Sequence, residues 1–397
     1  MSVSRSPSTA VPLRLVTTPV PNAPEPPVIV HAIGGRADAV RLAPVIGALE
    51  RQDVFRQVVV HTGSAQDRGL VGELADELGL PAADHVLDVG AGSDAGLTAQ
   101  TLTAFDALLR ELPPELVMLS GDTNATLSCA LAAAKRQVAV AHVGSGLRSW
   151  DWTTPEEINR VVIDRLSDTL FTHSHEAVDN LLAEGVSDGR VHPVGSTVVD
   201  ALRRVEPAIR SREAWTALDL PPGDYVLVML HHRDAIADGA RRDALVAGLA
   251  TLAGEAPVAF ALHPAAAPTL NAAGAIARLQ AAGVRTVPPM GHVDFLSLEL
   301  GAGAIVTDSG TVQEEATVLG VPCYTPGSLS EGRITLTHGT NVLLGEDAGA
   351  VATVRPSRTD HAPCVVPLWD GRAGERIAAA ILANYAVRAD QSSTSLR

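Results

Sequence analysis

The stretch Val306-Thr307-Asp308-Ser309-Gly310-Thr311-Val312-Gln313-Glu314-Glu315-Ala316 joins an apolar run to a helix-forming segment through a Ser-Gly turn. The apolar run begins at Ala304, and the helix-forming segment follows the turn at once. This order predicts a β-strand that leads directly into the N-terminus of a helix. At such a terminus the unpaired backbone N–H groups and the helix dipole favour an anion such as a phosphate.

Two carboxylates follow the turn in this segment, Glu314 and Glu315. Glu315 is placed to accept hydrogen bonds from a sugar diol, as the ribose-binding carboxylate does in other nucleotide-binding folds. The alternative is that both carboxylates only complement the helix dipole in the first turn. The polar clusters at the other predicted strand ends distinguish a nucleotide site from an ordinary helix start.

Short apolar runs alternate with longer helical patterns along the whole chain. Each run is followed by a polar or Gly-containing cluster and then by a helix, as at residues 39–51 and 98–112. We expect β-strands at residues 27–32, 57–62, 116–120, 138–143, 169–172, 225–230, 258–262, 284–287, 304–307 and 322–324. This βαβ rhythm is typical of parallel sheets that helices cover on both faces, the doubly wound α/β class.

The length and composition indicate two globular domains preceded by a tail. At 397 residues the chain is too long for one ordinary core, and 46% hydrophobic with 19% charged residues is a globular composition. The βαβ rhythm pauses around residues 197–222, and there we place the boundary between a first domain (28–203) and a second (204–370). Residues 1–27 are rich in Pro, Ser and Thr and lack the apolar core of a signal peptide, which predicts a disordered tail on a cytoplasmic protein.

The composition also disfavours several partners and chemistries. A formal charge of −15 argues against nucleic acid or an anionic membrane as the main partner, and no apolar stretch is long enough to cross a bilayer. The cysteines Cys129, Cys323 and Cys364 show no paired spacing, so neither a disulfide framework nor a zinc site is expected. Lys135 is the only lysine and lies at a predicted helix end, which argues against Walker-type phosphate binding and Schiff-base chemistry.

Polar clusters follow several of the predicted strands, and the ligands of open α/β sheets bind beyond the carboxyl ends of strands. The cluster Gly34-Gly35-Arg36-Ala37-Asp38, with Arg41 one turn further, combines glycines that let a ligand approach with a guanidinium that can pair with a diphosphate. In Gly121-Asp122-Thr123-Asn124, Asp122 is either a general acid or base or the N-cap of the next helix. Two α/β domains that face each other would bring such clusters to one cleft.

A further cluster carries paired carboxylates and arginines. The stretch from His142 to Arg148 precedes Pro155-Glu156-Glu157-Ile158-Asn159-Arg160, in which Pro155 suits the first turn of a helix. Glu156 and Arg160 are four residues apart and therefore share a helix face. They form either a surface ion pair or a carboxylate–guanidinium pair at a sugar-diphosphate site.

Histidines follow two predicted strands of the second half. His231 and His232 come directly after the strand at 225–230, and because adjacent residues point in different directions, joint metal ligation is not expected. One histidine at a strand end can bind phosphate or transfer a proton. His263, after the strand at 258–262, is a similar case.

Taken together, these clusters resemble the UDP-N-acetylglucosamine 2-epimerase family. The similar stretches are, in order, Gly121-Asp122-Thr123, His142 to Arg148, Pro155 to Arg160, Val194 to Ala201, Asp308 to Ala316 and Gly339-Thr340-Asn341. The resemblance runs from about Val28 to about Tyr385. It implies the GT-B architecture, in which two Rossmann-like domains face a central cleft and the last helix, here within residues 371–397, returns to the first domain. It also implies a homodimer.

The resemblance assigns roles around a UDP-sugar. The turn Ser309–Thr311 would hold the diphosphate and Glu315 the ribose hydroxyls, while Asp122 and Glu156 would handle protons at the sugar. The residues expected to contact the substrate are Arg36, Arg41, Arg148, His263, Ser309, Gly310, Thr311 and Glu315. The expected catalytic residues are Asp122, Glu156, Arg160 and His231.

The chemistry implied by the resemblance explains the need for carboxylates. The C2 proton of an N-acetylhexosamine is not acidic, because no carbonyl lies next to that carbon in the ring. Family enzymes eliminate UDP across C1–C2 to form a glycal and add it back after protonation on the other face. This requires an acid or base on each side of the ring and firm capture of the departing UDP, and it requires no redox cofactor.

The sequence departs from the family's pattern mainly on the sugar side. The family has Glu at the third position of His-Val-Glu-Ala-Gly-Leu-Arg, where this chain has Gly144. Thr62-Gly63-Ser64-Ala65 replaces the family's Thr-Gly-Gln-His, and Ser330-Glu331-Gly332-Arg333-Ile334 replaces Thr-Glu-Arg-Pro-Glu. A 2-epimerase is the first interpretation. The alternatives are a glycosyltransferase-like or hydrolytic enzyme that uses a UDP-sugar, and a nucleotide-sugar-binding protein without catalysis.

Overall fold

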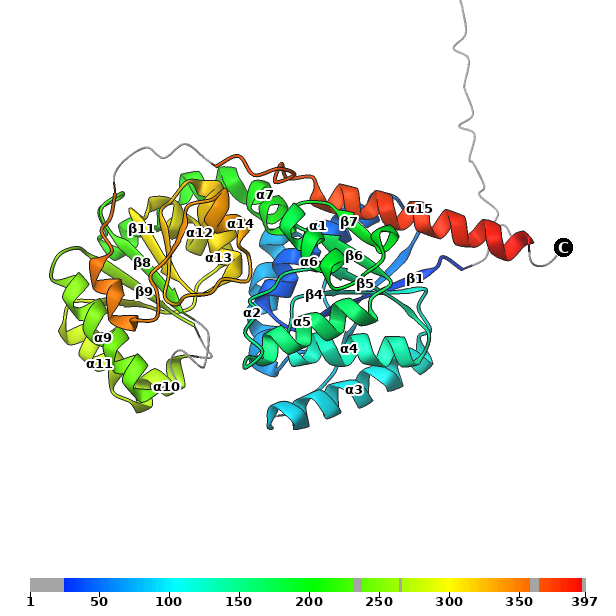
Figure 1. Ribbon diagram of the computed structural model, residues 1–397, viewed down its shortest axis with the longest axis horizontal. Coiled ribbons are helices and arrows are strands. Elements are labelled where there is room, and N and C mark those ends of the chain that lie inside the picture. The colour runs from blue at the N-terminus through cyan, green and yellow to red at the C-terminus, as the bar shows by residue number, and fades with distance from the viewer. Residues whose placement is uncertain (1–24, 91, 231–237, 264–265, 358–363, 395–397) are drawn as a thin grey trace, which may run out of the picture.

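Two α/β units lie side by side in the computed structural model (Figure 1). The structure describes residues 25–90, 92–230, 238–263, 266–357 and 364–394. Each unit contains one parallel sheet, of seven strands in the first and six in the second. Most of the predicted tail lies outside the described residues.

The first sheet has the strand order β3-β2-β1-β4-β5-β6-β7, and every neighbouring pair is parallel. Its strands are β1 (Val28–Ile33), β2 (Arg56–His61), β3 (His85–Val86), β4 (Leu116–Ser120), β5 (Ala139–Val143), β6 (Thr169–Thr172) and β7 (Val191–Pro193). The central strands are apolar on both faces, as expected where helices cover both sides of the sheet. The switch in order beside β1 is the position at which doubly wound sheets bind ligands.

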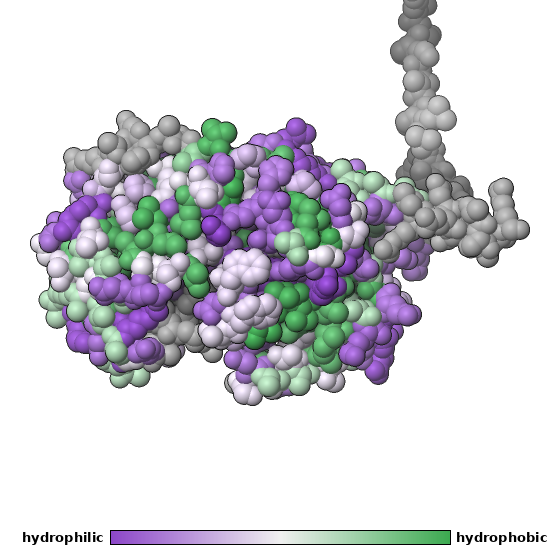
Figure 2. Space-filling view, in the orientation of Figure 1, coloured by the Kyte–Doolittle hydropathy of each residue, from purple (hydrophilic) through white to green (hydrophobic). Residues whose placement is uncertain are grey.

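Helices cover both faces of this first sheet. They are α1 (Arg36–Glu50), α2 (Ala65–Leu78), α3 (Asp94–Glu111), α4 (Asn124–Lys135), α5 (Pro155–Leu166), α6 (His175–Ala183) and the 3-10 turn η1 (Asp188–Arg190). Several begin at a Ser or Thr whose hydroxyl accepts a hydrogen bond from a first-turn N–H, which stabilises the helix start. Figure 2 shows hydrophobic residues exposed over α5, where Ile158 and Val162 lie at the surface.

The second sheet has the strand order β10-β9-β8-β11-β12-β13, and every neighbouring pair is again parallel. Its strands are β8 (Val226–Leu230), β9 (Val258–Leu262), β10 (Arg285–Val287), β11 (Ala304–Thr307), β12 (Cys323–Thr325) and β13 (Asn341–Leu343). Its helices are α9 (Gly239–Ala253), α10 (Ala267–Ala272), α11 (Ala275–Ala281), α12 (His292–Gly301), α13 (Gly310–Leu319), α14 (Ile334–Thr337) and η3 (Ala348–Thr353).

Two helices tie the units together. The connecting helix α7 (Thr197–Arg212), followed by η2 (Ala214–Leu218), packs against α1 of the first unit and α12 of the second. The predicted domain boundary at residues 203 and 204 falls inside α7, and the boundary stays a prediction. The last helix, α15 (Ala373–Thr394), packs on α1 through Ile377, Ala378 and Ile381. No helix of the described residues is long and apolar enough to span a membrane.

All ten predicted strands are confirmed to within about two residues at either end. The strands that the sequence pattern missed are β3, β7 and β13. Each lies at the edge of its sheet and is only two or three residues long. An edge strand is covered less than a central one and needs no continuous apolar run, so it leaves little periodic signal.

Candidate functional site

The N-terminus of α13 is open, although a serine stands in the capping position. The Ser309 hydroxyl makes no cap hydrogen bond, unlike the Ser and Thr residues that begin helices of the first unit. Glu314 and Glu315 lie in the second turn and are buried, so the interpretation that they complement the dipole in the first turn is wrong. The helix start therefore has free N–H groups for an anion, and the carboxylates behind it serve another purpose.

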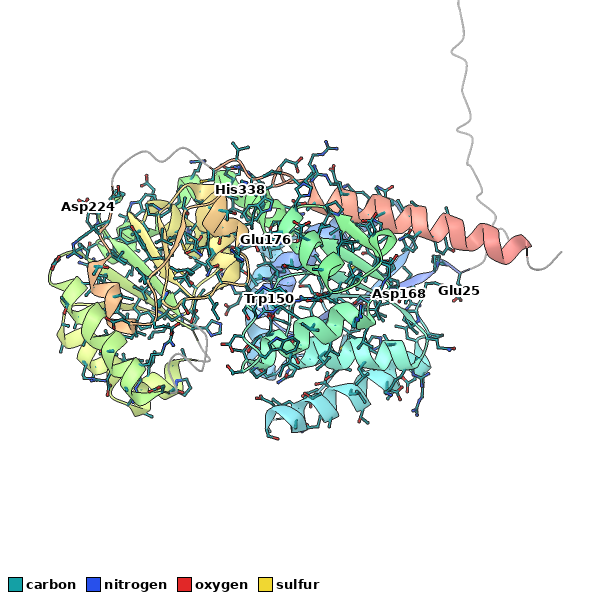
Figure 3. The ribbon with its side chains drawn as sticks, in the orientation of Figure 1. Glu25, Trp150, Asp168, Glu176, Asp224 and His338 are labelled. Carbon is teal, nitrogen blue, oxygen red and sulfur yellow. The ribbon has the colours of Figure 1, made fainter. Side chains whose placement is uncertain are left out.

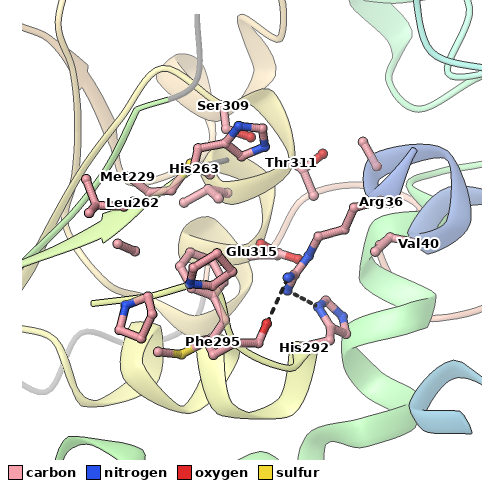
Figure 4. Close-up of a pocket in the computed structure, with 16 residues that line it drawn as sticks. Arg36, Val40, Met229, Leu262, His263, His292, Phe295, Ser309, Thr311 and Glu315 are labelled. Carbon is pink, nitrogen blue, oxygen red and sulfur yellow. Dashed lines mark hydrogen bonds between the residues drawn. The ribbon is translucent and has the colours of Figure 1, made fainter. Parts of the chain in front are cut away.

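A cavity opens beside this helix start and reaches the first unit. The space that it offers, together with the open solvent at its mouth, is about 860 Å³. Ser309, Thr311 and Glu315 line one wall, and His263 lines another. Figure 4 shows these side chains around the same space, with Arg36 entering from α1.

Arg36 and Arg41 extend from α1 into the second unit. Arg36 donates from Nη1 to the Met290 carbonyl at 3.1 Å and stands 5.7 Å from the centre of the Phe295 ring (Figure 4). Arg41 donates from Nη2 to the Thr311 hydroxyl at 3.2 Å, in the first turn of α13. Both guanidinium groups thus lie at the junction of the two units, beside the open helix start.

Arg160 on α5 contacts three carboxylates at the same junction. Its Nη1 lies 3.4 Å from Oδ2 of Asp122 and pairs with Glu331 of the second unit, and its Nε lies 3.3 Å from Glu157. Burial lowers the pKa of Arg160, but these carboxylates outweigh it and raise the pKa above its ordinary value. The guanidinium is therefore charged at any physiological pH.

Two of the sequence alternatives are decided by this geometry. Thr123, not Asp122, caps α4, because its hydroxyl accepts from the Thr126 N–H. The cap interpretation of Asp122 is therefore wrong, and its carboxylate faces Arg160. The expected pairing of Arg160 with Glu156 is also wrong: the partner on α5 is Glu157, which is fully buried.

The reason for this second correction lies in the loop before α5. The Glu157 carboxylate accepts hydrogen bonds from the backbone N–H groups of Ser149 and Trp150 and from the Ser149 hydroxyl. These bonds hold Glu157 inward, on the side of Arg160. Glu156, at the start of the same helix, is half-buried.

Glu331 lies over the open start of α13. A Cβ added to Gly310 would collide with the Glu331 carboxylate oxygen Oε1, so the carboxylate lies directly against this glycine. Gly332, the next residue, lies close to His173 and Leu147 of the first unit. At the same boundary, Arg333 lies 3.5 Å from Glu176, which Figure 3 labels.

Buried charged side chains hold the loop between β5 and α5 in place. His142 bonds through Nδ1 to Asp164 at 2.7 Å and through Nε2 to the Gly121 carbonyl at 3.0 Å, next to Asp122. The Arg148 guanidinium is 1% exposed and is held by Asp164 and Glu184. Arg148, expected to contact substrate, thus holds the loop inside the first unit, and the structure does not bring it to the cavity.

Gly144 stands at the end of β5 with a left-handed backbone, at φ +82°. A Cβ added there would meet nothing within 4 Å, so the position has room for a side chain. The backbone conformation nevertheless costs a non-glycine residue about 1 kcal/mol or more. The space in front of Gly144 is therefore open in this chain.

The two carboxyl groups in the second turn of α13, Glu314 and Glu315, have raised pKa values. Burial raises the pKa of Glu315 to about 8, against the lowering effect of Arg36. Burial likewise raises the pKa of Glu314 to about 7, against Arg41 and a hydrogen bond from Ser196. An anion and a sugar diol at this wall would therefore meet a site whose charge changes near neutral pH.

These shifts, together with that of the buried Glu299, predict that the free energy of unfolding falls by about 3 kcal/mol between pH 6.5 and pH 8. Glu299, Glu314 and Glu315 have raised pKa values in the folded protein, so the folded state binds protons that the unfolded state releases above about pH 4.5, and stability declines with rising pH. His31, His173 and His292 have lowered pKa values and act in the opposite sense, mostly below about pH 7, so they offset only part of this fall.

Urea unfolding of the whole chain at the two pH values measures this difference. Glu315→Gln is the matched control, because an amide cannot titrate and the fall should be roughly halved. A stability that stays level or rises from pH 6.5 to pH 8 would contradict the raised pKa values.

The predicted site residues divide into three groups. The structure brings together Arg36, Arg41, Asp122, Arg160, His263, Ser309, Gly310, Thr311 and Glu315 around the junction of the units. Glu156 lies one residue from this cluster at the start of α5, and Arg148 lies buried inside the first unit. His231 lies outside the described residues.

Glu157 and Glu331 are contacts that the sequence analysis did not select. Glu157 was part of the quoted helix start, but nothing in the sequence distinguishes it from the neighbouring Glu156. Glu331 had no local signal beyond a departure from the family pattern. No group of three or more His, Cys, Asp or Glu side chains in the described part of the chain is arranged to hold a metal ion.

Comparison with known proteins gives one consistent result. The model of the family described as UDP-N-acetylglucosamine 2-epimerase matches residues 47–382. The UDP-N-acetylglucosamine 2-epimerase of Methanocaldococcus jannaschii is 32% identical over 353 residues, 87% of this chain and 96% of that protein. The UDP-2,3-diacetamido-2,3-dideoxy-D-glucuronate 2-epimerase of Pseudomonas aeruginosa is 32% identical over 80% of this chain and 88% of its own length.

The solved structures agree with the predicted architecture. The crystal structure of the M. jannaschii epimerase in complex with UDP-GlcNAc and UDP superposes with a TM-score of 0.82 at 30% identity. The superposition covers 90% of this chain and 99% of that one. The expectation of two facing Rossmann-like units is confirmed.

Proposed function

The chain belongs to the UDP-N-acetylglucosamine 2-epimerase family, and from this premise we propose that it is a UDP-sugar 2-epimerase acting on a 2-acetamido sugar. The observation that carries the proposal is the junction of the units, where the open start of α13 meets Arg160 and Asp122. The second unit offers the backbone N–H groups at the start of α13, which suit a diphosphate. The first unit offers a carboxylate, Asp122, and a cation, Arg160, beside the place for the sugar.

The reaction is an elimination followed by its reversal on the other face. A base removes the proton from C2, the C1–O bond breaks, and its electron pair leaves with the UDP oxygen as a glycal forms. Readdition of UDP at C1 with protonation of C2 from the opposite face gives the epimer. In this scheme Asp122 and Glu156 exchange protons with C2, and Arg160, with the N–H groups of α13, stabilises the negative charge on departing UDP.

The nucleotide end is proposed from the cavity beside α13. The Ser309–Thr311 turn binds the diphosphate, Glu315 accepts from the ribose hydroxyls, and Arg36 and Arg41 neutralise phosphate charge. The relatives differ in the sugar that their names specify, so the sugar is not fixed by the fold. A homodimer is expected from the resemblance alone.

A hydrolytic outcome is the second candidate, and Gly144 favours it. We propose that this glycine replaces a catalytic carboxylate of the family, since a side chain at this position would have open space in front of it. Water that enters this space can add across the C1–C2 double bond of the glycal in place of UDP, with its hydroxyl going to C1 and a proton going to C2. Free sugar and UDP would then be the products.

Incubation with UDP-N-acetylglucosamine in D₂O, followed by NMR, tests the proposal. A manno product with deuterium at C2 supports epimerisation. Free sugar and UDP support hydrolysis. An unchanged sugar without exchange, in a protein that binds UDP, contradicts both for this substrate.

Glu331→Gln should bind UDP more tightly than the unaltered protein, by roughly 3- to 10-fold. The carboxylate of Glu331 lies against Gly310, where the proposed diphosphate would have to enter, so it competes with that anion. Calorimetric titration with UDP measures the change. Glu346→Gln, an exposed acid whose carboxylate accepts from the Ser328 hydroxyl, is the matched control and should leave affinity unchanged. Weaker binding by Glu331→Gln would show that Glu331 supports the nucleotide instead.

A further inference from the structure

A second carboxyl group, Glu299, is buried behind Glu315 without a use in the proposed reaction. It lies on α12 and is 0% exposed, and Glu315 on the adjacent α13 is 3% exposed. Glu315 lines the cavity beside α13, whereas Glu299 does not. Glu299 is therefore out of reach of a ligand and faces the residue that would touch it.

Helix geometry explains why Glu299 points this way. Phe295, four residues earlier, lies on the same face of α12 and lines the cavity. Glu299 follows one turn further along this face and lies near the buried Tyr225 and Cys323 of the core. A leucine would fit such surroundings at lower cost, because a buried carboxyl group loses its hydration.

No donor of the described residues satisfies either oxygen of Glu299. The group within hydrogen-bonding reach is the Glu315 carboxyl, and two carboxyl groups can bond only if one of them carries a proton. Burial, with the charge of Glu315, raises the pKa of Glu299 well above its ordinary value. The pair therefore keeps at least one proton at neutral pH.

The other charged and titratable groups around the pair come from helices and strands of both units and from Tyr225, just before β8. Arg36 on α1 and Arg41 favour the ionised form of Glu315, and Glu314 opposes it. Tyr225 and Cys323 face Glu299 and have raised pKa values, for which burial is the first cause, so both stay neutral. Glu73, Glu77 and His292 face Arg36 rather than the carboxyl pair.

We propose that Glu299 is a positioning residue that, as a neutral acid, donates a hydrogen bond to Glu315 and so fixes the carboxylate that recognises the ribose. One oxygen of Glu315 accepts from Glu299, and the other remains for the sugar diol. This inference rests on the proposed nucleotide site and deepens it. It assigns a proton-carrying group to a position that no substrate touches.

Two substitutions separate this role from a purely structural one. Glu299→Gln keeps a donor for Glu315 but cannot titrate, and Glu299→Leu fills a similar volume without a donor. UDP and 2′-deoxy-UDP are titrated calorimetrically into the unaltered protein and both variants. Thermal unfolding of each protein shows whether the fold is intact.

The Leu variant should bind UDP roughly 10-fold more weakly and lose most of its preference for UDP over 2′-deoxy-UDP. The Gln variant should stay within about 3-fold of the unaltered protein for both ligands. As the pH rises far enough for the pair to give up its last proton, the unaltered protein should lose UDP affinity, while the Gln variant, which keeps its donor, should not. Ionisation of UDP itself is common to all three proteins and cancels in the comparison.

Equal affinity, equal ribose preference and equal pH profiles in all three proteins would overturn the inference, whatever the change in thermal stability. If the Leu variant does not fold, the pH profile of the Gln variant decides. Failure of the unaltered protein to bind UDP is a different result: it contradicts the proposed function and removes the basis of the inference with it.

Discussion

Replacing Asp122 by Asn should lower kcat/KM for the UDP-sugar by roughly 10²–10⁴-fold, the usual loss when a positioned acid or base is removed. Asp122 is the carboxylate that the structure holds beside Arg160 at the junction, 3.4 Å away, with its side chain 27% exposed and open to a ligand. Asn keeps the shape and a contact with Arg160 but cannot accept a proton. The loss should therefore appear in kcat, with UDP affinity within about 3-fold of the unaltered protein.

Proton exchange at C2 provides the direct measurement for this variant. The rate of deuterium incorporation from D₂O should fall together with kcat, because both report removal of the same proton. Asp188→Asn, an exposed acid on η1, is the matched control and should behave like the unaltered protein. Retention of full exchange by Asp122→Asn would transfer the proton-handling role to Glu156.

Replacing Arg160 by Met should destabilise the protein by about 3–5 kcal/mol, the cost of leaving buried carboxylates without their cation. Glu157 is fully buried, and it shares this guanidinium with Asp122 and Glu331. The same change removes the positive charge proposed to stabilise departing UDP, so kcat/KM should fall by roughly 10²–10³-fold.

Urea unfolding and steady-state kinetics measure these two losses separately. Arg165→Met, on an exposed position of the same helix, is the control and should change neither by much. Adding Glu331→Gln to Arg160→Met should recover part of the stability, because one of the stranded charges is then gone. Additive effects of the two substitutions would mean that their contact contributes little.

The architecture was accessible from the sequence because central parallel strands are continuous apolar runs. The runs at β4, β6, β9 and β11 predict their strands without error, since both faces of each strand are buried. β3, at the outer edge, is a His-Val pair whose residues are both exposed, and no local pattern distinguishes it from a loop. The missed elements are therefore those whose pairing depends on a neighbour rather than on their own residues.

The candidate site was accessible where one element carries the chemistry. The Ser-Gly turn before α13 predicts an anion site from a few adjacent residues, and the polar end of β4 predicts a proton-transferring carboxylate in the same way. Glu331 and Glu299 do not, because their meaning comes from another part of the fold. Glu331 meets Arg160 only when the units close on each other, and Glu299 meets Glu315 only when α12 packs on α13.

Arg36, Arg41 and Glu331 join the units through Met290, Thr311 and Arg160. A nucleotide sugar entering the junction must first separate these groups. The measured dissociation constant will therefore exceed the intrinsic one by the factor that describes how rarely the junction opens unaided. Affinity in this protein therefore depends partly on the contacts between the units, and substitutions that weaken those contacts without removing a phosphate-binding group, as Glu331→Gln does, will be measured as tighter binding.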